Sequence, residues 1–251
     1  MKAMKPGAVS SPSPSFQPLY QQIKELLTQG LQNGEWQPGE TIPSEIDLAA
    51  RYQVSQGTVR KAIDELAAEN ILVRRQGKGT FVATHTEEAA SVFRFLRIRR
   101  CDGREEAPES RLLEVRRGKA TAEVARALQM KPGEAVVVLS RVLDYSGEPI
   151  IYDEITLPGV LFKGLTKAKC EAYKGSMYSF FETQFGVRMI RAEERLRAIG
   201  AEPEVARELR VAPGTPLLSV DRIAYTYGDR PVELRRGLCT TRHHCYINQL
   251  G

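Results

Sequence analysis

The stretch from residue 43 to residue 82 reads PSEIDLAARYQVSQGTVRKAIDELAAENILVRRQGKGTFV, and it decides the fold of the first part of the chain. Ser44 is placed to cap a short helix, and Asp47, three residues later, can return the capping bond. Residues 53–55 make a turn, and Ser55 at its end can cap a second helix. The inward face of this helix is predicted to hold Val59, Ile63, Leu66 and Asn70.

A helix precedes this stretch, because apolar side chains at positions 20, 23, 27 and 31 share one face and Gly34 ends the pattern. After the helices, residues 71–76 and 80–82 are typical of β-strands, and a Gly-Lys-Gly turn joins them in a tight basic hairpin. Each part alone is common in other folds. The order capped helix, three-residue turn, helix and basic hairpin predicts a winged helix-turn-helix.

Basic side chains gather on the third helix and the hairpin, where DNA phosphates would run: Arg60, Lys61, Arg74, Arg75 and Lys78. The whole chain carries a net charge of only +5. The clustering, rather than the overall charge, therefore indicates a nucleic-acid partner.

The second part of the chain contains an internal repeat. EVARALQMKPGEAVVVLSRVLDYSGEP begins at Glu123, and EVARELRVAPGTPLLSVDRIAYTYGDRP begins 81 residues later at Glu204. Each copy reads as a helix, a Pro-Gly stop, a strand and a Gly-containing hairpin into a second strand. The repeat predicts two pseudo-symmetric halves that contribute strand pairs to one antiparallel sheet with packed helices, an α+β fold. The same offset pairs Arg141 with Arg222, and the sequence assigns no role to Arg222.

These patterns divide the chain into a Pro/Ser-rich leader (1–15), a winged helix-turn-helix domain (16–84), a polar linker (85–92) and a second domain (93–251). No run of about eighteen apolar residues is present, so a transmembrane helix is not predicted. The N-terminus has no apolar stretch behind its lysines, so a secretory signal is not predicted either. Four scattered cysteines do not form a disulfide framework, and we expect the protein in the reducing cytoplasm.

The first domain resembles the DNA-binding domain of the GntR family of bacterial transcription regulators over residues 18–82, through PLYQQIKELL and the stretch quoted above. The second domain is similar to the UTRA effector-binding domain of the HutC subfamily. The matching segments are GEPIIYDEITLP (147–158), GSMYSFFETQFG (175–186) and RAEERLRA (191–198). This resemblance implies a chorismate-lyase-like sheet for the second domain.

In that family the start of the third helix and the wing read DNA. The resemblance therefore implies DNA contacts from Ser44, Ser55, Gln56, Thr58 and Arg60, with Gly77 and Lys78 from the wing. The family often has Arg at two positions where this chain has Ile46 and Gln56. Arginine suits guanine and glutamine suits adenine, which leaves room for an operator other than the family's short GT…AC palindrome.

A second candidate site lies at Gly175 and Ser176, where the serine can cap a helix that begins at Tyr178 and ends before Gly186. A capped helix N-terminus offers N–H groups to a carboxylate or phosphate, although the serine can also serve the helix alone. In the family this loop and nearby strand arginines hold an acidic effector. The resemblance carries that role to Ser176, Tyr178 and Arg141, with Glu154 and Glu233 for hydroxyl or amine groups. Some relatives have a second Arg where this chain has Leu143, so a carboxylate is at least as plausible as a phosphate.

Metal and catalytic motifs were weighed as well. Cys239, His243, His244 and Cys245 lie close together in the sequence, but no second ligand pair accompanies them, as a structural zinc site requires. The sequence contains no GxSxG or HExxH motif. We therefore expect no metal, no cofactor and no catalytic residues.

The sequence thus predicts a homodimeric transcription regulator, taken to be a repressor, that binds a palindrome and releases it when a small acid fills the second domain. A hinge at residues 85–91 would relay the change. Because the UTRA fold resembles chorismate lyase, the alternative is a small-molecule lyase or hydrolase tethered to a DNA-binding module. A non-specific architectural DNA binder is a third possibility, which calls for a more basic first domain.

Overall fold

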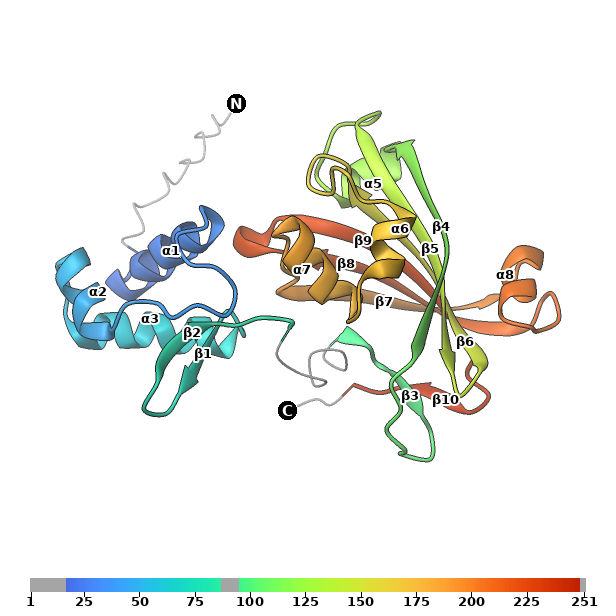
Figure 1. Cartoon of the computed structure of the whole chain (residues 1–251), viewed down its shortest axis with the longest axis horizontal. Helices are drawn as coiled ribbons and strands as arrows, with labels where there is room; N and C mark the ends of the chain where they lie inside the picture. Colours follow the sequence, from blue (N-terminus) through green and yellow to red (C-terminus); the bar gives the residue numbers. More distant parts are fainter. Residues whose placement is uncertain (1–16, 87–94, 249–251) are drawn as a thin grey trace, which may run out of the picture.

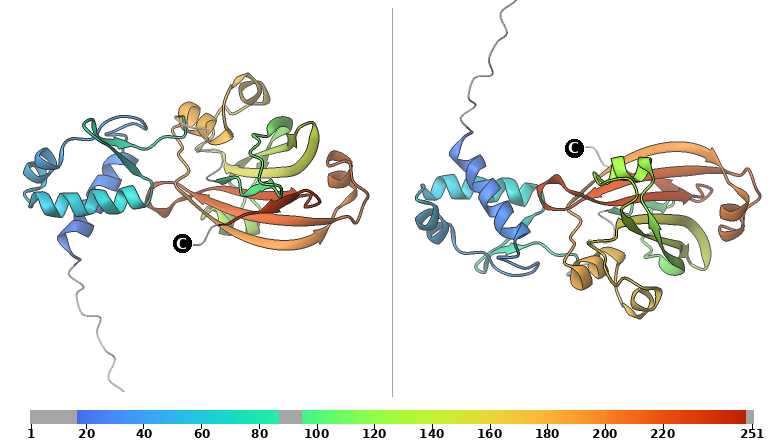
Figure 2. Two further views of the ribbon diagram at one scale, coloured as in Figure 1. Left: turned by 90° about the horizontal axis from the view of Figure 1, so that it is seen from below. Right: turned by 90° about the horizontal axis from the view of Figure 1, so that it is seen from above.

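The computed structural model describes residues 17–86 and 95–248, which form two parts side by side along the longest axis of the molecule (Figure 1). The smaller part contains three helices and a hairpin, and the larger part is built around an antiparallel sheet. Two further views show the same separation, with α8 at the end of the sheet remote from the smaller part (Figure 2). The predicted leader and residues 87–92 of the predicted linker lie outside the described residues, so the proposed domain boundaries stay predictions.

The smaller part is a winged helix-turn-helix. Its elements are α1 (Leu19–Gln32), α2 (Glu45–Tyr52), α3 (Gln56–Ala68), β1 (Leu72–Arg75) and β2 (Gly79–Val82). Both predicted helix caps form: Asp47 N–H donates to Ser44 Oγ, and Thr58 N–H donates to Ser55 Oγ, each at 3.2 Å. Ser44 N–H also donates to the Asp47 carboxylate at 3.3 Å, which completes a capping box.

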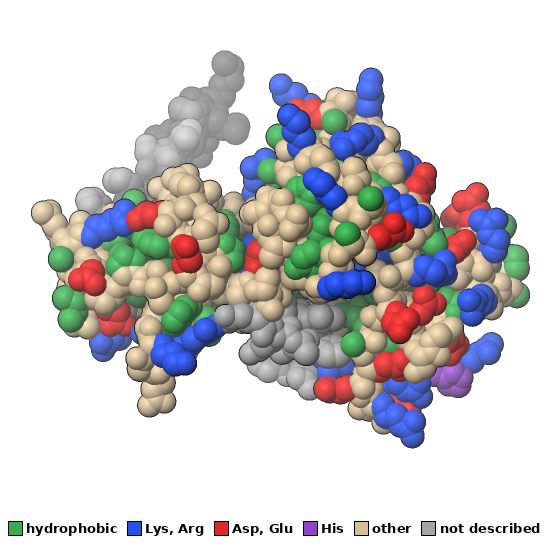
Figure 3. All heavy atoms as spheres, in the orientation of Figure 1, with side chains coloured by type: hydrophobic (Ala, Val, Ile, Leu, Met, Phe, Trp, Pro, Cys, Tyr) green, Lys and Arg blue, Asp and Glu red, His purple; other side chains and the backbone are tan. Residues whose placement is uncertain are grey.

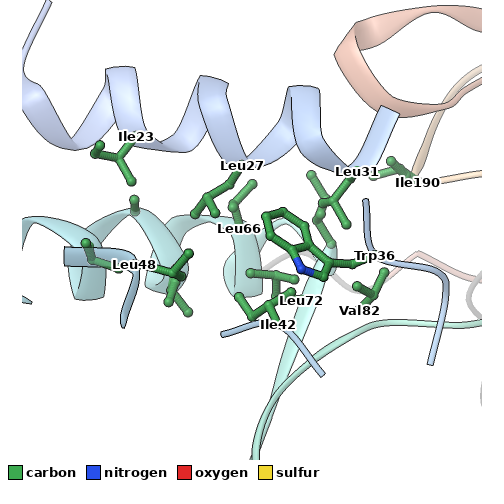
Figure 4. Close-up of a cluster of buried hydrophobic side chains, with 14 residues drawn as sticks. Ile23, Leu27, Leu31, Trp36, Ile42, Leu48, Leu66, Leu72, Val82 and Ile190 are labelled. Atoms are coloured by element: carbon green, nitrogen blue, oxygen red, sulfur yellow. The ribbon is translucent and has the colours of Figure 1, made fainter. Parts of the chain in front are cut away.

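The core of this domain lies between α1, α3 and the hairpin (Figure 4). Ile63 and Leu66 of α3 are fully buried, and such side chains stabilise a fold by about 1.5–3 kcal/mol each. Trp36 closes the core after α1. Ile190 also belongs to this cluster, although it lies in the larger part of the chain. The hydrophobic core of the winged domain therefore extends into the larger part of the chain.

The larger part is an α+β domain, as predicted. Its strands are β3 (Ile98–Arg100), β4 (Glu109–Lys119), β5 (Ala135–Tyr145), β6 (Glu148–Pro158), β7 (Arg191–Gly200), β8 (Pro216–Tyr225), β9 (Pro231–Cys239) and β10 (His244–Tyr246). Its helices are α5 (Ala122–Ala127), α6 (Lys167–Ala172), α7 (Met177–Phe185), α8 (Pro203–Glu208) and the 3-10 turn η1 (Tyr227–Asp229). Six strands form one antiparallel sheet in the order β4-β5-β6-β9-β8-β7, and β3 pairs with β10 separately.

The repeat appears as the symmetry of this sheet. The first copy supplies α5, β5 and β6, and the second supplies α8, β8 and β9. β6 and β9 pair at the centre, so the two halves meet there. Helices α6 and α7 lie together on one side of the sheet (Figure 2). This arrangement leaves one face of the sheet to form a cavity with α6, α7 and the β3–β10 pair.

Candidate functional sites

Glu45, at the start of α2, connects α3 with the β1–β2 hairpin, which is the wing of this domain. Its carboxylate accepts hydrogen bonds from Gln56 Nε2 at 3.2 Å and Arg60 Nε at 2.9 Å, both on α3. Arg74 Nη1 of β1 donates to the other carboxylate oxygen at 2.8 Å. Three predicted DNA contacts therefore converge on one acidic residue that the sequence reasoning did not single out.

The ion pairs fix the charge of Glu45. Burial would raise the pKa of its carboxyl group, but the hydrogen bonds from Arg74 and Arg60 lower that pKa below its ordinary value. The carboxylate is therefore ionised at neutral pH. Arg74 also binds Asp64 of α3 at 2.8 Å, so the wing is tied directly to α3 as well as to α2 through Glu45.

The other predicted basic residues do not join this group. Lys61 Nζ lies 3.8 Å from the centre of the Tyr20 ring, on the side of α3 that faces α1. Arg75 follows Arg74 in a strand and therefore points to the other face of the hairpin, where its guanidinium stacks on Phe81 at 4.5 Å. These contacts separate Lys61 and Arg75 from the cluster at Glu45.

The wing tip and the helix caps present the remaining predicted DNA contacts. Gly77 and Gly79 both have positive φ, and Lys78 N–H closes the turn on Arg75 O at 2.9 Å. Lys78 is exposed at the tip, whereas Ser44 and Ser55 are exposed at the starts of their helices and Thr58 is half-buried. On the face shown in Figure 3, acidic and basic side chains are interspersed over this domain.

The larger domain contains a cavity of about 800 Å³ on the inner face of the sheet. Alternate residues of the strands supply its floor, as expected for side chains that share one face. The predicted loop forms its rim: Gly175 and Ser176 line the cavity, and Ser176 Oγ caps α7 by accepting from Ser179 N–H at 3.1 Å. The cavity wall is apolar at Leu96, Ile98, Leu112, Leu143, Ile151, Met177, Phe180 and Val220.

Three buried arginines lie on the cavity floor, each bound to a carboxylate. Arg141 donates to Asp153 at 3.0 Å, and Arg235 reaches the same Asp153 oxygen at 3.3 Å. Arg222 donates to Glu194 at 2.7 Å. Burial would raise the pKa of Asp153, but Arg235 and Arg141 lower it, so this carboxylate is ionised too.

Tyr178 links this floor to α7. Its hydroxyl donates to Glu233 at 2.9 Å and accepts from Arg222 Nη1 at 3.3 Å. Burial raises the pKa of the Tyr178 phenol, so the group is neutral and can fill both roles. Among the predicted effector contacts, Arg141, Ser176 and Tyr178 therefore surround one cavity.

The two predicted glutamates are placed differently. Glu154 follows Asp153 in β6 and therefore points to the opposite face of the sheet, where Arg116 lies 3.4 Å away. The expectation that Glu154 faces the effector is thus at odds with its position, and Asp153 is the acid that lines the cavity. Glu233 is completely buried beneath Tyr178 and does not line the cavity.

Asp153, Arg222 and Arg235 are cavity residues that the sequence reasoning did not assign. A signal for one of them was present, because Arg222 is the repeat partner of Arg141. In the sheet Arg141 lies opposite Asp153, and Arg222 lies opposite Arg235. The two halves thus bring corresponding strand pairs to the same cavity floor.

Neither a metal site nor a membrane helix is found in the part of the chain that the structure describes. Within residues 17–86 and 95–248, no group of three or more His, Cys, Asp or Glu side chains is arranged to hold a metal ion. No helix in these ranges has both the length and the apolar character needed to span a bilayer.

Comparisons with known proteins match both domains. Residues 19–82 match the family described as bacterial regulatory proteins, gntR family, and residues 103–244 match the UTRA domain. The chain is 30% identical to the histidine utilization repressor of Pseudomonas putida, over 87% of this chain and 86% of that protein. It is 29% identical to the repressor NagR of Bacillus subtilis, over 93% of this chain and 95% of NagR.

Two solved structures of similar fold cover the larger domain and nearly the whole chain, respectively. The ligand-binding domain of a GntR-family regulator from Bordetella bronchiseptica is 51% identical, with a TM-score of 0.61, over 62% of this chain and 98% of that one. The regulator YydK of Bacillus subtilis is similar in fold over 94% of this chain and all of its own, with a TM-score of 0.55 at 19% identity.

Proposed function

The chain belongs to the GntR family of bacterial regulatory proteins and carries a UTRA domain, and from this premise we propose that it is a repressor released from DNA by a small organic acid. Membership of the family makes it a DNA-binding transcription regulator. The relatives from Pseudomonas putida and Bacillus subtilis are named as repressors, which supports the negative sign of the regulation.

The convergence of Gln56, Arg60 and Arg74 on Glu45 carries the proposal for DNA binding. Without DNA, the Glu45 carboxylate is the anionic partner that holds these three donors together. On the operator, phosphates replace it as partners of the arginines, and Gln56 at the start of α3 becomes available to a base edge. Ser44, Ser55, Thr58, Gly77 and Lys78 complete the proposed contact surface.

A palindromic operator and a homodimer follow from the size of the reading module. One winged domain offers few base contacts, and a two-fold axis doubles them on a symmetric site. We propose that the larger domain provides the dimer contact. A regulator of this kind acts where the chromosome is, which supports a location in the cytoplasm.

The cavity supports a carboxylate more than a phosphate as the acidic group of the effector. The buried arginines already have Asp153, Glu194 and Glu233 as partners, so the floor carries little uncompensated positive charge. A singly charged carboxylate needs less compensation than a phosphate dianion. The N–H groups at the start of α7, beside Ser176, supply the remaining donors. The apolar wall then fits an apolar body on the acid.

The alternative, a lyase or hydrolase on a DNA-binding module, gains little support. The relatives are transcription regulators, and fold resemblance alone does not carry catalysis. Among the described residues that line the cavity there is no histidine to act as a general base. Conversion of a bound acid to a product of different mass, followed by mass spectrometry, would restore this alternative.

Two experiments test the proposal. Selection from a random DNA library by the full-length protein should enrich a palindrome that binds at least about 1,000-fold more tightly than random DNA at 0.15 M salt. Failure to enrich any sequence contradicts the regulator function.

Native mass spectrometry of the fresh protein should show a dimer, and a co-purified acid released on denaturation would give the effector mass. A strict monomer contradicts the palindrome proposal.

A further inference from the structure

Arg188 lies between α7 and β7 in the larger domain, yet its guanidinium binds the backbone of the winged domain. It is only 2% exposed. Nη2 donates to Asn70 O at 2.8 Å, and Nη1 donates to Ile71 O at 3.4 Å. These two carbonyls stand where α3 ends and the wing begins. Arg188 therefore contacts the junction between the two elements that present the proposed DNA contacts.

Glu182 of α7 contacts the other end of the wing. Its carboxylate accepts the His85 N–H at 3.1 Å and the Thr84 hydroxyl, both just after β2. It also lies 3.5 Å from Nε of Arg188, so one buried ion pair joins the two contacts. Glu182 and Arg188, called here the interdomain clamp, thus hold the start and the end of the wing together.

Packing around the clamp joins the same two domains. Ile190, two residues after Arg188, enters the core of the winged domain beside Leu31 (Figure 4). Gly228, in the hairpin between β8 and β9, lies so close to α1 that an added Cβ would overlap the Gln32 side chain. The winged domain is therefore docked at several points on the end of the sheet that carries α7.

The helix that provides Glu182 also borders the effector cavity. Tyr178, one turn earlier on α7, lines the cavity, and its ring lies 5.6 Å from the ring of His85. His85 Nε2 in turn lies 2.8 Å from the carbonyl oxygen of Met189, the neighbour of Arg188. A short chain of contacts therefore runs from the cavity wall to the clamp.

We propose that the interdomain clamp positions the winged domain for operator binding, and that the contents of the cavity act on the clamp through Tyr178 and His85. This inference rests on the proposed function and names the residues that regulate it. A ligand that displaces Tyr178 displaces His85, and with it the segment that holds Glu182 and Arg188 against the wing. The two placements of the wing then differ in DNA affinity, which is what effector control requires.

The first experiment uses hydrogen exchange in the DNA-free, full-length protein, so its outcome does not depend on the proposed function. Arg188→Lys keeps the charge but loses the planar fork that reaches two carbonyls. Peptides from residues 69–86 should exchange about 10-fold faster, while peptides from β4 and α8 stay as in the wild type. Arg195→Lys, an exposed change on β7, is the matched control. Equal acceleration in both domains, or none, overturns the clamp.

Glu182→Gln gives a second variant in case Arg188→Lys does not fold. It keeps the shape of the side chain and removes the charge that pairs with Arg188. The same regional acceleration over residues 69–86 is expected.

The second experiment tests transmission with a double-mutant cycle on operator affinity, using the DNA selected above. Tyr178→Leu removes the ring that contacts His85, and Tyr173→Leu removes another ring that lines the cavity and packs on Phe180 at 5.3 Å. Tyr178→Leu should change the operator Kd by about 10-fold in the wild-type background but less than about 2-fold beside Arg188→Lys. Tyr173→Leu should have the same effect in both backgrounds.

Additive effects of Tyr178→Leu and Arg188→Lys overturn the transmission, because a purely structural role predicts them. If the wild type selects no operator, the proposed function fails, and the hydrogen exchange result still decides whether the clamp exists.

Discussion

Arg141 on β5 lies directly opposite Asp153 on β6, and two of its guanidinium nitrogens bind the Asp153 carboxylate at 2.9 and 3.0 Å. Both side chains are almost completely buried. Arg235 approaches the same carboxylate from β9. Asp153 therefore orients two of the three arginines on the cavity floor, and Glu233 supplies the second carboxylate, which pairs with Arg235 at 2.9 Å.

Asp153→Asn should destabilise the protein strongly. Removing one partner of a buried ion pair leaves the other charge without compensation, which costs about 3–5 kcal/mol. Urea unfolding followed by circular dichroism measures the loss. Glu154→Gln is the matched control, because it removes the next carboxylate on the exposed face, where an ion pair contributes at most about 1 kcal/mol. Equal losses for the two variants would contradict the assignment of Asp153 as the buried partner.

Glu45→Gln should increase affinity for random DNA and reduce discrimination. The change frees Arg60 for phosphates and leaves Arg74 with Asp64 as its remaining partner, and a surface ion pair of about 1 kcal/mol corresponds to about 5-fold in affinity. Losing the carboxylate that binds both arginines also loosens the arrangement of α3 and the wing. Fluorescence anisotropy on selected and random DNA measures both effects. Glu25→Gln makes the same charge change on the exposed side of α1, and a similar gain there would refute the local explanation.

The helix caps and the wing could be predicted from the sequence, because each depends on residues only a few positions apart. Ser44 and Ser55 cap helices through bonds that span three residues, so their spacing alone reveals them. The wing follows from a Gly-Lys-Gly turn between two β-like runs. The repeat correctly predicted two halves of one sheet, since each copy contains a complete helix-and-hairpin unit.

The cavity and the clamp depend on contacts that no local pattern contains. β6 is apolar on both faces, so the sequence could not show that Asp153 points inward and Glu154 outward. Arg188 binds Asn70 across 118 positions of the sequence, and this pairing exists only once two domains dock. The contacts of Glu45 could likewise not be predicted from the sequence, because they form only when α2, α3 and β1 pack together.

Gln56→Arg should change the base that the protein selects. Gln56 stands at the start of α3, where glutamine suits adenine and arginine suits guanine. A good bidentate contact discriminates by about 1–3 kcal/mol, or about 5- to 150-fold. Library selection with the variant should therefore replace A by G at one position in each half-site. Lys78→Arg is a useful control, since a phosphate contact at the wing tip should leave the selected sequence unchanged.

His244 should make the stability of the protein depend on pH. It is buried against Tyr145, and neither ring nitrogen has a hydrogen-bond partner within the described part of the chain. Burial, with Arg100 nearby, lowers the pKa of its imidazole below the ordinary 6.5. The unfolded chain therefore binds a proton first as the pH falls below 6.5, and folding loses up to about 1.4 kcal/mol per pH unit until the folded pKa is reached. Between about pH 7 and pH 5, urea unfolding should show a smaller loss for His244→Phe than for the wild type. Identical slopes for the two proteins would show that His244 is not the titrating group.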